Sequence, residues 1–252
     1  MAPRIAVVAA VLALLAAAVY WFVLRERFQP PPPPPVSQAP AAPEKKGPQF
    51  PIESPAKPLP KLGESDPALR EAIAGLVDPA SLAKFFGLED GIRKIVATVD
   101  NLSREIVAER VRVVKPMGGQ VLVTGKDETL AISPRNYARY TPFVRMVEAA
   151  DVPKAVAAYV YLYPLFQQAF VELGYPDAYF NDRLVEVIDD LLEAPEPKGP
   201  VKLVVPKVLY EYADPELERL SAGQKMLIRV GPENEARLKA KLKEIRAAVT
   251  AR

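Results

Sequence analysis

The stretch YPLFQQAFVELGYPDAYFNDRLVEVIDDLL, residues 163–192, decides the fold class because it contains most of two amphipathic helices and the bend between them. Gly174 stands where the first helix is expected to end in the left-handed conformation, and Pro176 prevents that helix from resuming. Asn181 stands immediately before a second apolar repeat, which predicts that its side chain caps the next helix. The stretch therefore predicts two consecutive helices joined by a tight bend.

The apolar spacing on both sides of the bend supports the helical prediction. The first helix is expected from Asp151 to Gly174, with a kink at Pro164. Its apolar stripe consists of Val156, Tyr159, Val160, Tyr163, Phe166, Phe170 and Leu173. The second helix has Leu184, Val185, Ile188, Leu191 and Leu192 on one face.

The rest of the sequence after Leu62 predicts more helices and a little strand. Helix starts are expected after Ser65, Asp78, Ser133 and Asp214, and further helices over residues 91–102 and 232–249. Residues 118–133 predict a β-hairpin turning at 125–127, and 201–205 and 208–212 are short strand candidates. In the last helix, Leu238, Leu242, Ile245 and Val249 form a narrow seam expected to dock on the core; a membrane or partner contact is the alternative. The predicted fold class is mainly α (α+β).

Composition excludes several classes of chemistry. The 252-residue chain has no histidine and no cysteine, which excludes Ser/His/Asp triads, cysteine nucleophiles and zinc sites built on those ligands. Carboxylates, lysine, tyrosine, hydroxyl groups or a hard cation remain possible, and no cofactor is expected. The chain has 33 basic and 31 acidic residues, and this near neutrality argues against a nucleic-acid partner.

The N-terminus predicts membrane attachment. After a short tail, residues 1–4, an uncharged apolar run of residues 5–24 would extend about 30 Å as a helix, enough to cross a hydrocarbon core. A cleaved secretion signal is the alternative, because residues 16–18 are alanines. The aromatic residues 20–22 favour an uncleaved anchor. We therefore expect a single-pass membrane protein.

A proline-rich tether is predicted over residues 25–61, ahead of a globular domain over residues 62–252. Proline has no backbone donor and favours the extended polyproline conformation, so the tether should be stiff. A spacer that reaches into the envelope is the preferred interpretation, and a disordered linker is the alternative. The order of tail, span, tether and domain favours a C-terminal domain outside the cytoplasm.

An acidic stripe on the second helix supplies the candidate site. Asp182, Glu186, Asp189 and Glu193 fall on the face opposite the apolar stripe. They form either a solvated surface or a face that binds a cation or a sugar. With neighbouring aromatic and polar residues, the candidate binding set is Tyr175, Tyr179, Asn181, Asp182, Arg183, Glu186 and Asp189. Such a mixture suits a glycan surface, although core packing explains the same tyrosines.

A catalytic alternative uses carboxylates alone. Glu172 precedes the bend, so it could approach Asp177 or Asp182 and form the pair that a glycoside hydrolase requires at roughly 5–10 Å. The separation of these carboxylates depends on the fold of the bend, so the pair is an expectation of the catalytic alternative.

Four motifs resemble a known family. TVDNL at Thr98, PRNYARY at Pro134, YPLFQQAFVELGYPDAYFNDRL at Tyr163 and ADPELERLSAGQKMLIRVGPENEARLKAKLKEIR at Ala213 are similar to the bacterial domain of unknown function 3014. The resemblance extends from about Leu59 to the C-terminus. It implies a Gram-negative envelope protein with an N-terminal anchor, so the expected location is the bacterial inner membrane, single-pass, with the C-terminal domain in the periplasm. The resemblance supplies no reaction. We expect a non-enzymatic domain that binds or scaffolds a partner protein or peptidoglycan; a histidine-independent glycan hydrolase is the alternative.

Overall fold

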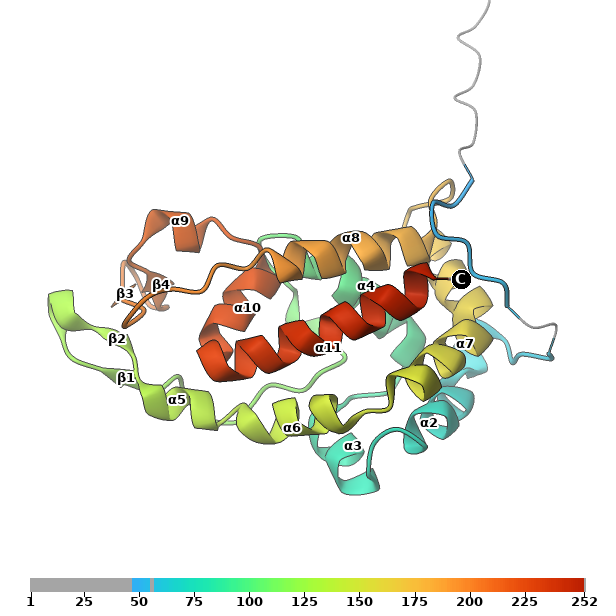
Figure 1. Ribbon diagram of the computed structural model, residues 1–252, viewed down its shortest axis with the longest axis horizontal. Helices are drawn as coiled ribbons and strands as arrows, with labels where there is room; N and C mark the ends of the chain where they lie inside the picture. The colour runs from blue at the N-terminus through green and yellow to red at the C-terminus, as the bar shows by residue number, and fades with distance from the viewer. Residues whose placement is uncertain (1–46, 55–56, 252) are drawn as a thin grey trace, which may run out of the picture. The chain divides into compact units, whose positions relative to one another are not determined.

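A computed structural model describes residues 47–54 and 57–251. All of these residues fall in one compact unit, residues 46–252 (Figure 1). The expected N-terminal tail, the anchor over residues 5–24 and the first part of the tether lie outside the described residues. Within the described part, no helix combines the length and the apolar character needed to cross a bilayer.

The described unit is mainly helical with two small antiparallel hairpins, which confirms the mainly α prediction at that level. Its α-helices are α2 (Asp66–Ala74), α3 (Pro79–Phe85), α4 (Gly91–Leu102), α5 (Pro134–Ala138), α6 (Thr141–Ala149), α7 (Val152–Glu172), α8 (Phe180–Leu192), α9 (Pro215–Glu218), α10 (Ala222–Val230) and α11 (Pro232–Thr250). Three single-turn 3-10 helices are η1 (Leu62–Glu64), η2 (Glu109–Val111) and η3 (Asp127–Thr129). The strands are β1 (Val123–Thr124), β2 (Ala131–Ile132), β3 (Leu203–Val204) and β4 (Glu211–Tyr212).

Four predicted helix starts are confirmed by their capping bonds. The side chain of Asp78 accepts a hydrogen bond from the Ser81 N–H, Ser133 from Arg135, Asp151 from Lys154 and Asp214 from Glu216. Each cap is followed by proline within the first two helical positions, where the missing N–H costs nothing. These starts depend only on local sequence, which explains why they could be predicted.

Two predicted caps are wrong. Helix α2 does begin after Ser65, but the Ser65 hydroxyl donates to the carbonyl of Leu62 and caps nothing. Helix α8 begins at Phe180, one residue before the predicted cap Asn181. The Phe180 N–H is bound by Gln167 Oε1 from α7 at 2.9 Å. A tertiary partner has therefore taken over the capping function that local sequence assigned to Asn181.

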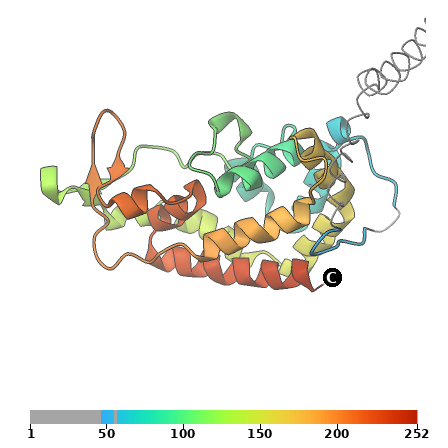
Figure 2. The ribbon, with the colours of Figure 1, turned by 90° about the horizontal axis from the view of Figure 1, so that it is seen from above.

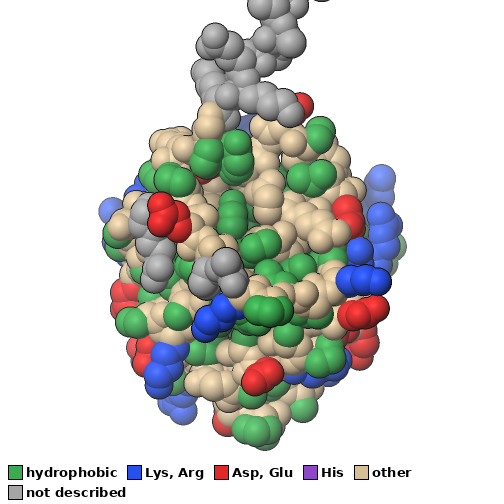
Figure 3. Space-filling model, turned by 90° about the vertical axis from the view of Figure 1, so that its right-hand side faces the viewer, with side chains coloured by type: hydrophobic (Ala, Val, Ile, Leu, Met, Phe, Trp, Pro, Cys, Tyr) green, Lys and Arg blue, Asp and Glu red, His purple; other side chains and the backbone are tan. Residues whose placement is uncertain are grey.

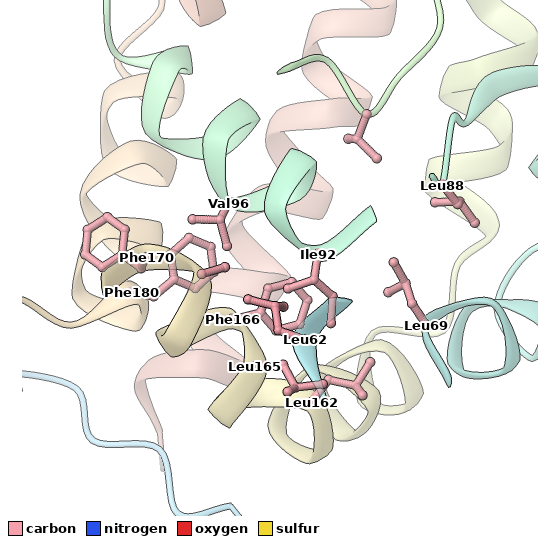
Figure 4. Packing of buried hydrophobic residues seen from close by; sticks show 12 residues of the cluster. Leu62, Leu69, Leu88, Ile92, Val96, Leu162, Leu165, Phe166, Phe170 and Phe180 are labelled. Carbon is pink, nitrogen blue, oxygen red and sulfur yellow. The ribbon is translucent and has the colours of Figure 1, made fainter. Parts of the chain in front are cut away.

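The main core lies where α4, α7 and α8 meet (Figure 4). Ile92 and Val96 of α4 point toward Phe166 of α7, as the α4 and α7 stripes predicted. The rings of Phe166 and Phe180 stack with centroids 5.7 Å apart. Further buried members of this cluster are Leu62, Leu69, Leu88, Val113, Leu162, Leu165, Ala169 and Phe170.

Helix α11 lies along α8 and packs on α6, α7 and α10 as well. Its seam docks as expected. Val249 is buried in a cluster with Val152, and Ile245 packs on the same cluster. Leu238 and Leu242 pack against buried side chains of α8 and α10. The prediction that this helix docks on the core is therefore confirmed.

The two hairpins lie side by side. Val123 pairs with Ile132 in the first hairpin, and Leu203 pairs with Tyr212 in the second. The connection of the first hairpin, residues 125–130, contains η3 and is longer than the predicted turn at 125–127. A bridge between Ala131 and Lys202 joins them. The strands are only two residues long, shorter than the alternating sequence predicted, and Figure 2 shows the β3–β4 hairpin projecting from the helices.

Candidate functional site

The predicted binding set is divided among several structural contacts. Asn181 and Asp182 hold a segment from the N-terminal side of the unit: Asp182 accepts hydrogen bonds from the backbone N–H groups of Gln49 and Phe50, at 2.9 and 2.8 Å. Asn181 Nδ2 donates to the Phe50 carbonyl at 2.9 Å. Asn181 and Asp182 bind residues 49–50, and Tyr159 binds Asn181. We call these residues together the N-terminal clasp.

Asn181 is fully buried, with 0% of its surface exposed, and all of its side-chain bonds are internal. Its Nδ2 also donates to the Val249 carbonyl, one of the carbonyls that the last turn of α11 leaves without a helical partner. Its Oδ1 accepts from the Tyr159 hydroxyl at 3.1 Å. Burial raises the pKa of Tyr159 strongly, so this hydroxyl stays protonated and donates. Asn181 therefore acts as a structural tie.

Apolar contacts extend the clasp along the chain. Phe50 and Ile52 pack on buried valines of α7, α8 and α11, and the Ser54 hydroxyl donates to the Val160 carbonyl at 2.8 Å. The packed part of the chain thus starts before Leu62, where the folded domain was expected to begin. The many prolines of residues 25–61 predicted a tether, so the packing of Phe50 and Ile52 was not expected.

A buried ion cluster joins the bend to α4. Asp100 is only 3% exposed, and its carboxylate is bound by Arg183 at 3.0 Å, by Arg104 at 2.8 Å and by the Tyr175 hydroxyl at 3.3 Å. Arg183 also donates to Ser103 Oγ and to the Asp100 carbonyl. The Tyr175 ring stacks on Phe170 with centroids 4.5 Å apart. We call Asp100, Arg104, Tyr175 and Arg183 the Asp100 cluster.

Sequence reasoning missed Asp100, although a signal was present. Asp100 stands four residues after the core residue Val96, on the buried face of α4. A carboxylate at that position needs partners, because an isolated charge in the interior is costly. The motif TVDNL, which carries the family resemblance, contains this residue.

The proposed catalytic carboxylates have separate partners. Glu172 accepts from Arg93 Nε at 2.8 Å and from Gln168 at 3.1 Å, beside a shallow depression of about 380 Å³. The Arg93 hydrogen bond holds the pKa of Glu172 below its usual range. Asp182 belongs to the N-terminal clasp, and Asp177 is an exposed residue of the turn.

Two of the remaining stripe residues pair with arginine side chains of the described unit. Glu186 pairs with Arg183 at 3.2 Å, and Asp189 forms two bonds with Arg246 of α11, one of 2.9 Å. Arg246 lowers the pKa of Asp189. Glu193 is exposed, and Tyr179 is half-buried immediately before α8. The stripe therefore helps to join α8 to its neighbours, and neither sign of charge gathers on the end of the unit that Figure 3 displays.

A second hollow of about 430 Å³ lies between the hairpins and the start of α11. Its walls are mainly apolar, and Glu235, which is 1% exposed, contributes to its lining. Glu235 Oε1 lies 2.8 Å from Lys239 Nζ but receives no well-directed hydrogen bond. Burial raises the pKa of Glu235, and the Lys239 ammonium opposes that shift only in part. Nothing in the sequence pattern had singled out this residue.

The tip of the β3–β4 hairpin is an exposed apolar surface that the sequence analysis did not identify. We define the hairpin tip as residues 204–210. Val208 is 86% exposed and Leu209 76% exposed, and the other exposed apolar side chains of the tip are Val204, Val205 and Tyr210. The sequence interpretation used these residues only as strand candidates.

Within residues 47–54 and 57–251, no group of three or more acidic side chains is placed to hold a metal ion.

Comparison with known proteins gives one match. No curated protein and no solved structure matches the chain. Residues 91–246, from the start of α4 to the last turns of α11, match a family over more than half of the chain, and the Asp100 cluster and Asn181 lie within that range. The chain therefore belongs to the family described as Protein of unknown function (DUF3014).

Proposed function

We propose that this chain is a membrane-attached, non-catalytic binding protein of the bacterial envelope, and that its contact surface is the hairpin tip. The single observation that carries the proposal is the exposure of the large apolar side chains at residues 204–210. A soluble surface rarely exposes several adjacent large apolar side chains unless they contact something. Residues 5–24 would supply the attachment, as the sequence predicts.

The base of the hairpin is held firmly, so the tip is presented in a defined position. Leu203 and Tyr212 are buried. The Tyr212 hydroxyl donates to the Lys225 carbonyl at 2.8 Å, and its N–H donates to Glu218 at 2.8 Å. Burial raises the pKa of Tyr212 to about 12, so the hydroxyl remains a donor at neutral pH. A rigid base reduces the ordering cost of a contact at the tip.

The clasp and the hairpin tip lie at opposite ends of the compact unit (Figure 1). Residues 49–50 are fixed to α8 and α11 at one end, and β3 and β4 lie at the other. This arrangement suits a protein that is tethered through its N-terminal segment and makes contact elsewhere. It favours the hairpin tip over the predicted set at residues 175–189, whose polar groups largely bind within the unit.

The hydrolase alternative is less well supported. A general acid for glycoside hydrolysis needs a raised pKa, whereas Arg93 lowers the pKa of Glu172. Asp182 binds two backbone N–H groups of the clasp. The candidate carboxylates are therefore better explained by their structural contacts.

Site-specific photocrosslinking of the full chain in cells tests the proposal. A photoreactive residue replaces Leu209 in one variant and Ile106 in the control, because Ile106 is similarly exposed at 74% but lies far along the chain from the hairpin. We expect a crosslinked product from position 209 and none from position 106. Equal products from both positions, or none from 209, would remove the hairpin tip as the contact surface.

A further inference from the structure

We infer that the hairpin tip docks on the surface of an anionic lipid bilayer, with Val208 and Leu209 entering its apolar region. The inference rests on the membrane attachment in the proposed function. It adds the identity of the contact: a bilayer surface in place of a protein groove or a glycan.

The shape of the tip suits a bilayer. The tip projects beyond the helices as a loop (Figure 2), and its most exposed residues, Val208 and Leu209, are adjacent. A projecting apolar loop can enter a fluid interface without any preformed groove. Tyr210, 44% exposed beside them, combines an aromatic ring with a hydroxyl, a combination favoured at the membrane–water boundary.

The charges around the tip suit anionic headgroups. Lys207 is the only charged residue within residues 204–210, and it is exposed. Lys198 and Lys202 are exposed on the approach to the tip, and Glu211, Asp214 and Glu216 are exposed where the chain leaves it. Lysine can extend its ammonium group to phosphate while its alkyl stem lies along apolar surface. The charge within the tip itself is therefore positive, which favours an anionic bilayer over a neutral one.

The chain outside the described unit determines which bilayer surface is available. If residues 5–24 span a membrane, residues 25–46 connect that span to the unit and reach at most about 70 Å in the polyproline conformation. The hairpin tip is then confined near the same bilayer, where effective concentration makes a small contact sufficient.

The absence of cysteine makes a direct test possible. Leu209→Cys introduces a single thiol in the full chain, which is labelled with an environment-sensitive nitrobenzoxadiazole dye. Ile106→Cys is the matched control, and Val208→Cys provides a second tip position. The labelled chains are reconstituted into vesicles of phosphatidylglycerol and phosphatidylcholine, with and without a lipid-attached quencher.

Docking predicts a blue shift of the dye and loss of its fluorescence to the quencher at positions 208 and 209, and neither effect at position 106. The double substitution Lys202→Glu and Lys207→Glu should reduce the quenching at 209. If the full chain floats with the vesicles while position 209 remains unquenched, the docking inference fails and the attachment survives. A chain that does not float with the vesicles at all would overturn both. A position-209 crosslink to a protein in cells, without quenching in vesicles, would replace the bilayer by that protein.

Discussion

The carboxylate of Asp182 accepts a hydrogen bond of 2.8 Å from the backbone N–H of Phe50, a residue 132 positions earlier in the chain. The same carboxylate binds the neighbouring N–H of Gln49. One acidic side chain at the start of α8 therefore fixes the segment that precedes the folded helices. The first residue of the acidic stripe therefore binds the protein's own backbone.

Asp182→Ala should lower the free energy of unfolding by about 1–2 kcal/mol, because it leaves the two N–H groups without their acceptor. Exchange of the Phe50 amide hydrogen should become faster. Urea denaturation and hydrogen exchange of the full chain measure the two effects. Glu186→Ala is the control, and it should change stability by less than about 0.5 kcal/mol because its pair with Arg183 is exposed on the glutamate side. Equal effects of both substitutions would contradict the clasp.

Asn181→Ala should cost about 2–5 kcal/mol, since several buried groups lose their partners together. Those groups are the Tyr159 hydroxyl and the carbonyls of Phe50 and Val249. Asn101→Ala is a matched control because the Asn101 amide bonds only within its own helix, to the Ala97 carbonyl. A loss no larger than that of Asn101→Ala would show that Asn181 is not a tie.

Asp100→Ala should lower the free energy of unfolding by about 1–3 kcal/mol, because it removes the buried acceptor of Arg183, Arg104 and the Tyr175 hydroxyl, while Arg183 keeps its pair with Glu186. Glu172→Ala removes a carboxylate from an exposed pair with Arg93 and should cost less than about 1 kcal/mol. Thermal or urea denaturation gives both values. If the order were reversed, the Asp100 cluster would not be a principal contact between α4 and α8.

Glu235 should make the protein less stable as pH rises. Its folded pKa lies above the ordinary value of 4.5, so the folded state holds its proton more tightly than the unfolded state does. The resulting stabilisation is present below pH 4.5 and disappears as pH rises through the folded pKa. Glu235→Gln should remove this contribution and flatten the stability profile above pH 4.5.

Asp189→Asn provides a control of opposite sign. Arg246 lowers the pKa of Asp189 below 3.8, so its contribution is present above that pH and is lost in acid. The effect should be small because both partners are partly exposed. Urea titrations at several pH values compare the two variants with the unaltered chain. Profiles that shift in the same direction would refute the assignment for Glu235.

Gly231→Ala should destabilise the α10–α11 connection by about 1–3 kcal/mol. Gly231 has φ +89°, and a Cβ there would lie 2.3 Å from the ring of Tyr137. Gly75→Ala is the control: its φ is −77°, and no atom lies within 4 Å of the added Cβ. That substitution should be neutral or stabilise by up to about 1 kcal/mol, as judged by thermal unfolding. Similar losses from both would exclude the clash as the cause.

Local signals were sufficient for much of the fold. Asp78, Ser133 and Asp151 each precede a proline and a helical apolar repeat, so their caps depend on residues within three positions. Gly174 ends its helix with φ +116°, as its position before Pro176 indicated. These elements could be predicted because their determining contacts lie within a few residues along the chain.

The polar interior could not be predicted in the same way. Asn181 looks like a cap, yet Gln167 binds the first N–H of α8 and leaves Asn181 to bond distant carbonyls. Asp100 looks like an ordinary helical residue until Arg183 is brought beside it. Both outcomes depend on which helices pack together, and sequence periodicity reports only which face of each helix is buried.

The exposed tip was missed for a related reason. The sequence predicts short strands over residues 201–205 and 208–212, with no statement of which of them would be exposed. The observed strands contain only Leu203, Val204, Glu211 and Tyr212, and the residues between them extend past the last pair. A sequence pattern indicates strand character but does not say where a ladder stops.

The amide of Asn181 bonds both to Phe50, near the beginning of the compact unit, and to Val249, near its end. One side chain thus links the two ends of the compact unit through hydrogen bonds and closes a ring of chain. Removal of the last turn of α11 would open that ring and loosen the N-terminal segment at the same time. A pull on that segment would load several hydrogen bonds at once, because Asn181 and Asp182 together bind the adjacent residues Gln49 and Phe50.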